Sequence, residues 1–151
     1  ALPISRMASV TNATAMQAMW WAGLEGAPIG VLVGFVAAGV SVRAADIIGD
    51  TALHGAAGGC DGATVGLLVA LDADVNAKTK RGRTPLHSAA GNDNISAMKA
   101  LVAAGADVRA RTTDELNETP IEAARRCEHM LFASECEAAC AARDGGEARR
   151  S

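Results

Sequence analysis

Two histidines and a serine are the residues that most readily suggest catalysis in this chain of 151 residues. His54 and His87 carry the side chain that most often acts as a general base, and Ser88 directly follows His87. Adjacent residues on a helix point to different faces, however, so this pair is poorly arranged for nucleophile activation. The sequence also lacks a Gly-x-Ser-x-Gly motif and a glycine-rich phosphate-binding loop. We therefore expect a protein that is not an enzyme and needs no cofactor.

Three cysteines and a histidine near the C-terminus are zinc-ligand types. The Cys-x-His spacing of Cys127 and His129 and the Cys-x3-Cys spacing of Cys136 and Cys140 are compatible with zinc. Cys127 and Cys136 are nine residues apart, which is about 13 Å along a helix. That separation argues against convergence of the four side chains unless the last helix is bent. We expect no metal site, and these four residues are the candidates if one exists.

The same spacings disfavour disulfide bonds. Cys136 and Cys140 are one helical turn apart, and Cys127 is too distant from Cys136 to be bridged. Reduced thiols favour an intracellular, reducing compartment, cytoplasmic by default. The chain begins at Ala1 rather than Met, which leaves open a targeting peptide that has been removed.

Both histidines belong to a motif that recurs at a nearly fixed interval. Thr-Pro-Leu-His at 84–87 follows Thr-Ala-Leu-His at 51–54 by 33 residues, and Thr-Pro-Ile-Glu at 119–122 follows 35 residues later. A second segment, at 69–77, recurs at 102–110 and at 36–44. A period in this range indicates stacked structural units rather than one globule.

These segments resemble the ankyrin repeat, whose pattern runs from Gly-Thr-Pro-Leu-His-x-Ala-Ala to Gly-Ala-Asp-Val-Asn. The resemblance implies an all-α ankyrin-repeat solenoid of stacked helix-turn-helix units with β-hairpin-like connecting loops. It also implies that His54 and His87 are structural and hydrogen-bond to neighbouring units. We divide the chain into an N-terminal extension at 1–12, a degenerate first repeat at 13–45, repeats at 46–78 and 79–111, a C-terminal capping repeat at 112–143 and a flexible tail at 144–151.

Residue types at the turns fit this division. Thr84 suits a helix N-cap, and Pro85 suits the first helical position. Glycine, asparagine and aspartate tolerate left-handed backbone at helix ends and turns. We predict that conformation at Gly39, Asp72 and Gly105, which end the second helix of each unit, and at Gly49, Gly82 and Asn117, which precede the Thr motifs.

The terminal units depart from the pattern, as expected where an outer face meets water. Trp20 and Trp21 fall in the register of the missing first motif. We favour packing of a tryptophan into the first helix pair, and the alternative is that the other is an exposed anchor for a partner. Glu122 replaces the histidine of the last motif, and Cys140 stands where Gly105 predicts a glycine. The most apolar run, at 29–42, is shorter than the roughly 20 residues of a membrane-spanning helix, so we expect no membrane insertion.

Charge alternates in sign along the predicted loops. The first loop, 46–50, is acidic but contains Ile47 and Ile48; the second, 79–83, is basic and is flanked by Lys78; the third, 112–118, is acidic. The resemblance implies that loop tips and first helices line a concave binding face, and a basic centre suits a partner with acidic residues. A net charge of −3 and the acidic loops argue against nucleic acid.

The sequence thus predicts a protein–protein interaction module, an adaptor or scaffold. One alternative is a permanent structural subunit of a larger assembly, and a weaker alternative is a zinc-binding or regulatory subunit of an enzyme. We expect either a monomer or a subunit of a hetero-complex. The candidate partner-binding residues are Trp20, Trp21, Ile47, Ile48, Asp50, Lys78, Lys80, Arg81, Arg83, Ser88, Asn92, Arg111, Asp114 and Glu115.

Overall fold

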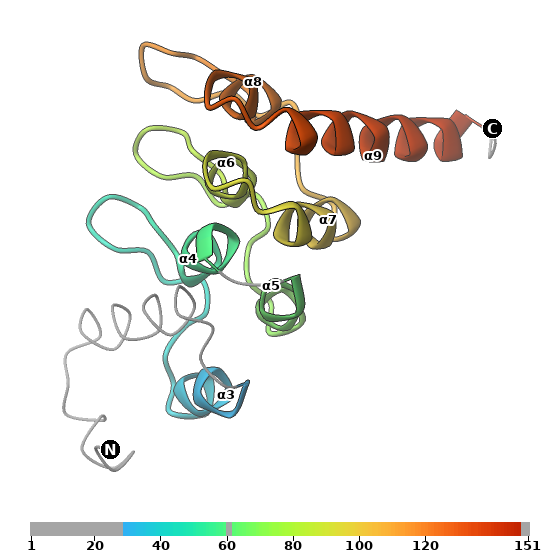
Figure 1. Cartoon of the computed structure of the whole chain (residues 1–151). Coiled ribbons are helices and arrows are strands. Elements are labelled where there is room, and N and C mark those ends of the chain that lie inside the picture. The colour runs from blue at the N-terminus through green and yellow to red at the C-terminus, as the bar shows by residue number, and fades with distance from the viewer. Residues whose placement is uncertain (1–28, 60–61, 149–151) are drawn as a thin grey trace.

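The computed structural model describes residues 29–59 and 62–148, which form helices joined by loops (Figure 1). The helices are α3 (Ile29–Ala37), α4 (Ala52–Gly59), α5 (Gly62–Ala70), α6 (Pro85–Gly91), α7 (Ile95–Ala103), α8 (Pro120–Arg126) and α9 (Met130–Ala148). The N-terminal extension at 1–12, Trp20 and Trp21 lie outside the described residues.

The helices stack in two rows. α4 packs on α6, and α6 packs on α8; α5 packs on α7, and α7 packs on α9. We call α4, α6 and α8 the loop-side row, because the connecting loops project beyond them in Figure 1, and α5, α7 and α9 the far-side row. The described part of the chain contains no β-strand. The predicted all-α stack of helix pairs is therefore confirmed.

Leucines and alanines fill the space between the rows. Leu53 and Leu86 of the loop-side row and Leu68 and Leu101 of the far-side row are fully buried, and each contributes roughly 1.5–3 kcal/mol on burial. Phe132 of α9 completes the same core at the C-terminal end. The buried alanines between them have small side chains that let neighbouring helices approach closely: Ala56, Ala57, Ala89, Ala90, Ala97 and Ala124.

Helices α3, α5 and α7 end as the residue types predict. Gly39, Asp72 and Gly105 follow α3, α5 and α7 with φ angles of 91°, 75° and 98°. At the other end of α7, Asn94 caps the helix, because its side-chain oxygen accepts a hydrogen bond from the backbone N–H of Ala97 at 3.1 Å. α6 begins with Pro85 directly after Thr84. These turns fix where each helix starts and stops.

Three loops precede the loop-side helices: loop 1 (residues 46–50), loop 2 (residues 78–83) and loop 3 (residues 112–118). Each is closed like a β-hairpin by one backbone N–H to carbonyl bond, of 2.9 Å in loops 1 and 2 and 3.1 Å in loop 3. Gly49, Gly82 and Asn117 are the left-handed residues of the three loops, with φ angles of 89°, 73° and 42°. The predicted hairpin-like connections are confirmed, although they form no named strand.

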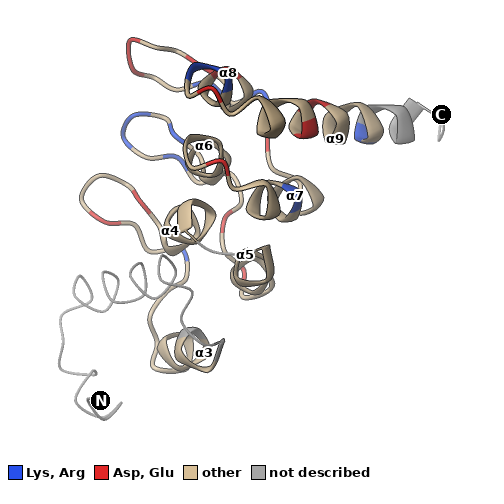
Figure 2. Cartoon of the chain, viewed as in Figure 1, with Lys and Arg blue, Asp and Glu red and all other residues tan. Residues whose placement is uncertain are grey.

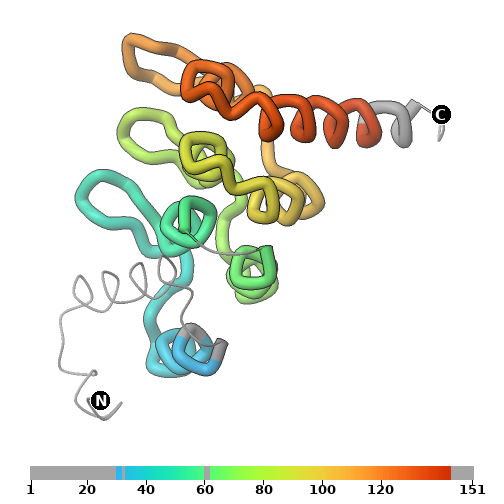
Figure 3. The backbone as a smooth tube through the Cα atoms, in the orientation of Figure 1, coloured from blue at the N-terminus to red at the C-terminus, as the bar shows by residue number. Residues whose placement is uncertain are grey.

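The loops also bond to one another. The N–H of Lys80 donates to the carbonyl of Ile48 at 2.9 Å, and the N–H of Thr113 donates to the carbonyl of Arg81 at 2.8 Å. Figure 3 shows the three loops stacked above one another on the same side of the helices. The loop backbones therefore form one continuous edge.

The C-terminal boundary differs from the prediction. α9 continues to Ala148, so residues 144–148 are helical rather than part of a tail that starts at 144. Cys140 stands at the position where Gly39, Asp72 and Gly105 end the earlier helices, and cysteine does not favour a left-handed turn. Within residues 29–59 and 62–148, no helix combines the length and apolarity needed to cross a membrane.

Loop stacking generates a stability prediction for Gly82. An added Cβ would lie 2.7 Å from the backbone nitrogen of Thr113, whereas at Gly105 it would meet no atom within 4 Å. Both residues have positive φ, so alanine at either position costs about 1–2 kcal/mol in backbone strain. We expect Gly82→Ala to lower the free energy of unfolding measurably more than Gly105→Ala in urea titrations. Equal losses would show that the contact between loops 2 and 3 is not tight.

Candidate functional site

His54 and His87 link each loop-side helix to the loop that follows it. Nε2 of His54 lies 3.1 Å from the carbonyl oxygen of Arg83, and Nε2 of His87 lies 3.0 Å from that of Glu118. The Nδ1 atoms accept hydrogen bonds from the backbone N–H of Thr51 at 3.2 Å and of Thr84 at 3.1 Å. Each imidazole therefore spans from the start of its own helix to the next repeat.

This geometry sets the protonation state of both rings. Because Nδ1 accepts from a backbone N–H, the ring proton must be on Nε2, which donates to the carbonyl. Burial lowers the pKa of His54 and of His87 below the ordinary value of 6.5. Neutral rings with both nitrogens engaged have a structural role, as the sequence predicted, and neither nitrogen is available as a general base.

Glu122 occupies, in α8, the position that the bridging histidine occupies in α4 and α6. The N–H of Thr119 donates to Oε2 of Glu122 at 2.7 Å, and the N–H of Glu122 donates to Oγ1 of Thr119 at 3.3 Å. This capping box replaces the histidine bridge in the last helix pair. The backbone hydrogen bond from Thr119 lowers the pKa of Glu122.

A groove of about 640 Å³ lies where α4, α6, loop 1 and loop 2 meet. Seven of the predicted partner-binding residues line it: Ile48, Asp50, Lys80, Arg81, Arg83, Ser88 and Asn92. His54, Gly55, Gly58 and Thr79 complete the lining. The structure therefore brings together residues that are up to 44 positions apart in the sequence, from Ile48 to Asn92.

Loop 2 supplies the groove with a cluster of unpaired cations. Lys78, Lys80, Arg81 and Arg83 make no side-chain hydrogen bond or ion pair with the described residues. Several exposed cations elsewhere are paired: Arg43 with Asp72 at 3.0 Å, Lys99 with Glu135 at 3.3 Å, Arg126 with Glu118 at 2.9 Å, and Arg125 with Glu137. Figure 2 shows loop 2 in blue between two loops that carry red acidic segments.

Loop 2 has a threonine hydroxyl at the position where loop 1 has an aspartate carboxylate. In loop 1, the carboxylate of Asp46 accepts hydrogen bonds from the N–H groups of Ile48 and Asp50, both at 2.9 Å. In loop 2 the equivalent residue is Thr79, whose hydroxyl accepts from the N–H groups of Arg81 and Arg83 at 3.3 and 3.2 Å. A neutral hydroxyl thus replaces the anion in the turn, and the loop keeps its full positive charge.

Two glycines line the groove, Gly55 and Gly58, which we call its floor, and neither was among the residues predicted to bind a partner. Gly55 and Gly58 lie on α4 and contribute no side chain where the groove passes. A Cβ on Gly58 would lie 3.2 Å from Nδ2 of Asn92. The available signal is the comparison between repeats, since Ser88 occupies the position equivalent to Gly55.

Among the described residues, the other predicted binding residues do not line the groove. Ile47 is 85% exposed, and Lys78 and Glu115 are also exposed. Arg111 donates to the carbonyl of Asn117 at 2.6 Å and pairs with Glu122 at 3.3 Å, so it does not add free charge to loop 2. Asp114 accepts from the hydroxyl of Thr112 at 2.6 Å, and this bond lowers the pKa of Asp114. Both side chains help to shape loop 3.

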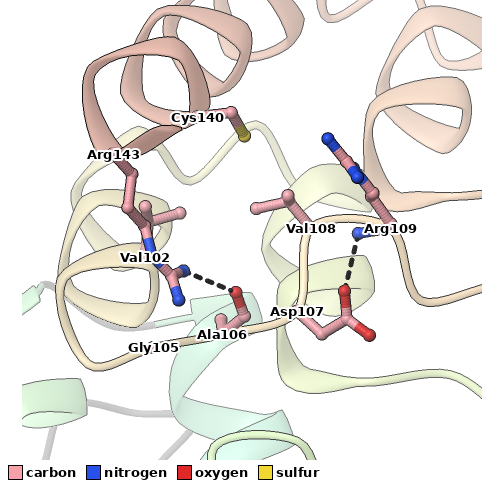
Figure 4. Close-up of a pocket in the computed structure, with 8 residues that line it drawn as sticks. All are labelled: Val102, Gly105, Ala106, Asp107, Val108, Arg109, Cys140 and Arg143. Carbon is pink, nitrogen blue, oxygen red and sulfur yellow. Dashed lines mark hydrogen bonds between the residues drawn. The ribbon is translucent and has the colours of Figure 1, made fainter. Parts of the chain in front are cut away.

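A smaller pocket of about 280 Å³ lies between α9 and the turn after α7 (Figure 4). Arg143 donates to the carbonyl of Ala106 at 3.2 Å across this pocket, and Cys140 lies beside it. Cys136 is fully buried one turn earlier, and burial raises the pKa of its thiol to about 12. A neutral, buried thiol behaves as a small hydrophobic side chain.

The candidate zinc ligands are not gathered into a site. Among the described residues, no group of three or more His, Cys, Asp and Glu side chains is arranged to hold a metal ion. His129 is engaged elsewhere, since its Nδ1 lies 2.8 Å from the carbonyl oxygen of Ala90 in α6. Cys127 is the C-cap of α8, where its N–H donates to Ala123 at 3.1 Å.

Comparison with known protein families gives one match. A family model described as ankyrin repeats, in three copies, matches residues 19–112. No curated protein matches the chain. The matched segment contains His54 and His87, loops 1 and 2 and every residue that lines the groove, whereas Glu118, which His87 contacts, lies beyond its end.

The buried neutral histidines predict that stability falls in mild acid. In the unfolded chain each imidazole takes up a proton near pH 6.5, whereas in the folded protein burial keeps it neutral to lower pH. The unfolded state therefore binds more protons below that pH, and the free energy of unfolding decreases as the pH falls. Each histidine adds a slope of at most about 1.4 kcal/mol per pH unit.

Urea unfolding at pH 7.5 and pH 5.5 measures this effect. We expect lower stability at pH 5.5, and a smaller difference between the two pH values in a His87→Gln variant. Asp114 and Glu122 have lowered pKa values and lose their contribution at more acidic pH, outside this window. A wild-type stability that is unchanged between the two pH values would contradict the assignment of neutral, buried rings.

Proposed function

The chain belongs to the ankyrin-repeat family, and on that basis we propose that it binds a protein partner reversibly, as an adaptor or scaffold that catalyses no reaction. Ankyrin repeats are generally protein–protein interaction modules and are typically non-catalytic. The observation that carries the proposal is the groove, where the unpaired cations of loop 2 meet the exposed surface of α4 and α6.

The rigidity of the groove supports the same proposal. The carbonyl of Arg83 is held by His54, and loop 2 is bonded on one side to Ile48 and on the other to Thr113. A binding loop that is already ordered loses little conformational entropy when a partner binds. The free cations of Lys80, Arg81 and Arg83 therefore stand on a fixed backbone, ready to meet negative charge.

A different observation favours the second candidate, a permanent subunit of an assembly. Met130 and Leu131 are adjacent at the start of α9 and are 64% and 60% exposed. Exposed neighbouring apolar side chains are typical of surfaces that a partner covers. Size-exclusion chromatography of the isolated chain separates the two: we expect a soluble monomer, whereas an obligate subunit would aggregate or elute as a larger species.

Affinity capture with matched charge variants tests the proposed binding face. We expect Lys80→Gln, Arg81→Gln and Arg83→Gln, combined in one chain, to abolish or greatly reduce capture of partner proteins from a lysate of the source cells. The control combines Arg43→Gln, Lys99→Gln and Arg125→Gln, which removes the same charge from cations that are already paired outside the groove. Each exposed pair contributes only ~0–1 kcal/mol, so the control should stay folded.

The two variants must behave differently for the proposal to stand. Capture that survives in the loop 2 variant would rule out the groove as the binding face. Equal loss in both variants would show that total charge, rather than the position of the charge, decides binding. Circular dichroism of both variants verifies that each remains helical.

A further inference from the structure

We propose that the groove accepts a short acidic segment of the partner, in which carboxylates face loop 2 and a neighbouring aliphatic side chain rests on the glycine floor of α4. This inference depends on the proposed function and adds the chemistry of the bound segment to it. Three observations carry it: the unpaired charge, the composition of the floor, and the apolar wall at Ile48.

The charge of loop 2 calls for an external counter-charge. Lys80, Arg81 and Arg83 line the groove without an ion pair, although five other lysines and arginines of the described chain have a carboxylate within 4 Å. The groove contains one carboxylate of its own, that of Asp50, and it forms no ion pair with the three cations. An acidic segment would supply the missing partners by direct charge complementarity.

The floor of the groove determines how close the segment can come. Gly55 and Gly58 present backbone rather than side chains, and backbone without a Cβ allows another chain to approach closely. Ile48, which is 53% exposed, forms an apolar wall beside this floor. An aliphatic side chain placed there would remove apolar surface of Ile48 from water.

Two polar side chains, those of Ser88 and Asn92, also line the groove. Asn92 donates from Nδ2 to the carbonyl of Ser88 at 2.8 Å, which orients the amide and leaves its side-chain oxygen without a donor among the described residues. The hydroxyl of Ser88 is likewise unbonded. These groups can hydrogen-bond to the backbone of a bound segment and so fix the direction in which its chain runs through the groove.

Nucleic acid fits the same groove less well. A phosphate backbone needs a continuous basic footprint, whereas loop 2 lies between loops that carry Asp46, Asp50, Asp114 and Glu115. Among the described residues, no Phe, Tyr or Trp lines the groove to stack on a base, and the imidazole of His54 is buried. A short acidic peptide matches an isolated basic patch with acidic neighbours.

Fluorescence anisotropy with a synthetic probe tests the proposal. The probe is a fluorescein-labelled peptide of two leucines flanked on each side by glutamates, and the comparison peptide has glutamine in place of every glutamate. We expect saturable binding of the glutamate probe to the full chain, weakening with added salt, and at least about tenfold weaker binding of the glutamine peptide. The variant with glutamine at positions 80, 81 and 83 should lose about tenfold in affinity for the glutamate probe.

Two leucine substitutions separate the groove from the fold. Gly58→Leu adds a side chain to the floor near Asn92, whereas Gly66→Leu adds the same side chain to α5 at a position with no atom within 4 Å of the new Cβ. Leucine favours helix over glycine at both sites. We expect Gly58→Leu to weaken probe binding about fivefold or more and Gly66→Leu to leave it within about twofold. Thermal melts of both variants verify the fold.

Several outcomes would overturn the inference. These are no saturable binding of the glutamate probe, equal affinity for the glutamine peptide, unchanged affinity in Gly58→Leu, or tighter binding of a labelled single-stranded oligonucleotide. If partner capture depends on loop 2 while the acidic probe fails to bind, the proposed function stands and this inference fails. If neither depends on loop 2, both fail.

Discussion

The hydrogen bond from a neutral imidazole to the carbonyl of the next loop is the interaction on which the rest of the structure depends. His54 and His87 are buried at the start of α4 and α6, and each reaches the last residue of the loop that follows its helix pair, Arg83 of loop 2 or Glu118 of loop 3. The bond fixes the distance between successive helix pairs, which the leucines and alanines then fill. Arg83 connects this bond to the groove, because its carbonyl accepts the hydrogen bond from His54 and its cationic side chain lines the groove.

The groove is a consequence of that spacing combined with local differences between repeats. Identical repeats would give identical loops and an even surface. Here Thr79 replaces the carboxylate that closes loop 1, so that loop 2 is wholly basic, and Gly55 replaces a side chain on α4, so that the surface beside loop 2 is hollow. The shared framework supplies rigidity, and the departures from it supply the features that a partner can recognise.

Local features were predictable from sequence because they depend on one residue type at one backbone position. The left-handed turns at Asp72, Gly82 and Asn117 and the structural role of His87 follow from conformational preference and from the period of the motif. The groove was predictable only in part. The basic residues of loop 2 were predicted from sequence, whereas the floor is made by Gly55 and Gly58, which have no side chain to draw attention to them. The pairing of Arg111 with Glu122 depends on the positions of both residues in space.

The tautomer and protonation state of His54 and His87 test the central claim most directly. Long-range proton–nitrogen correlation spectra of uniformly nitrogen-15-labelled protein report which ring nitrogen carries the proton. The account predicts that both neutral rings carry their proton on Nε2 and take up a second proton only at a pH below the pKa of about 6.5 of an exposed histidine. Rings protonated on Nδ1, or rings that titrate at the ordinary value, would contradict the bridging hydrogen bonds and with them the framework that positions loop 2.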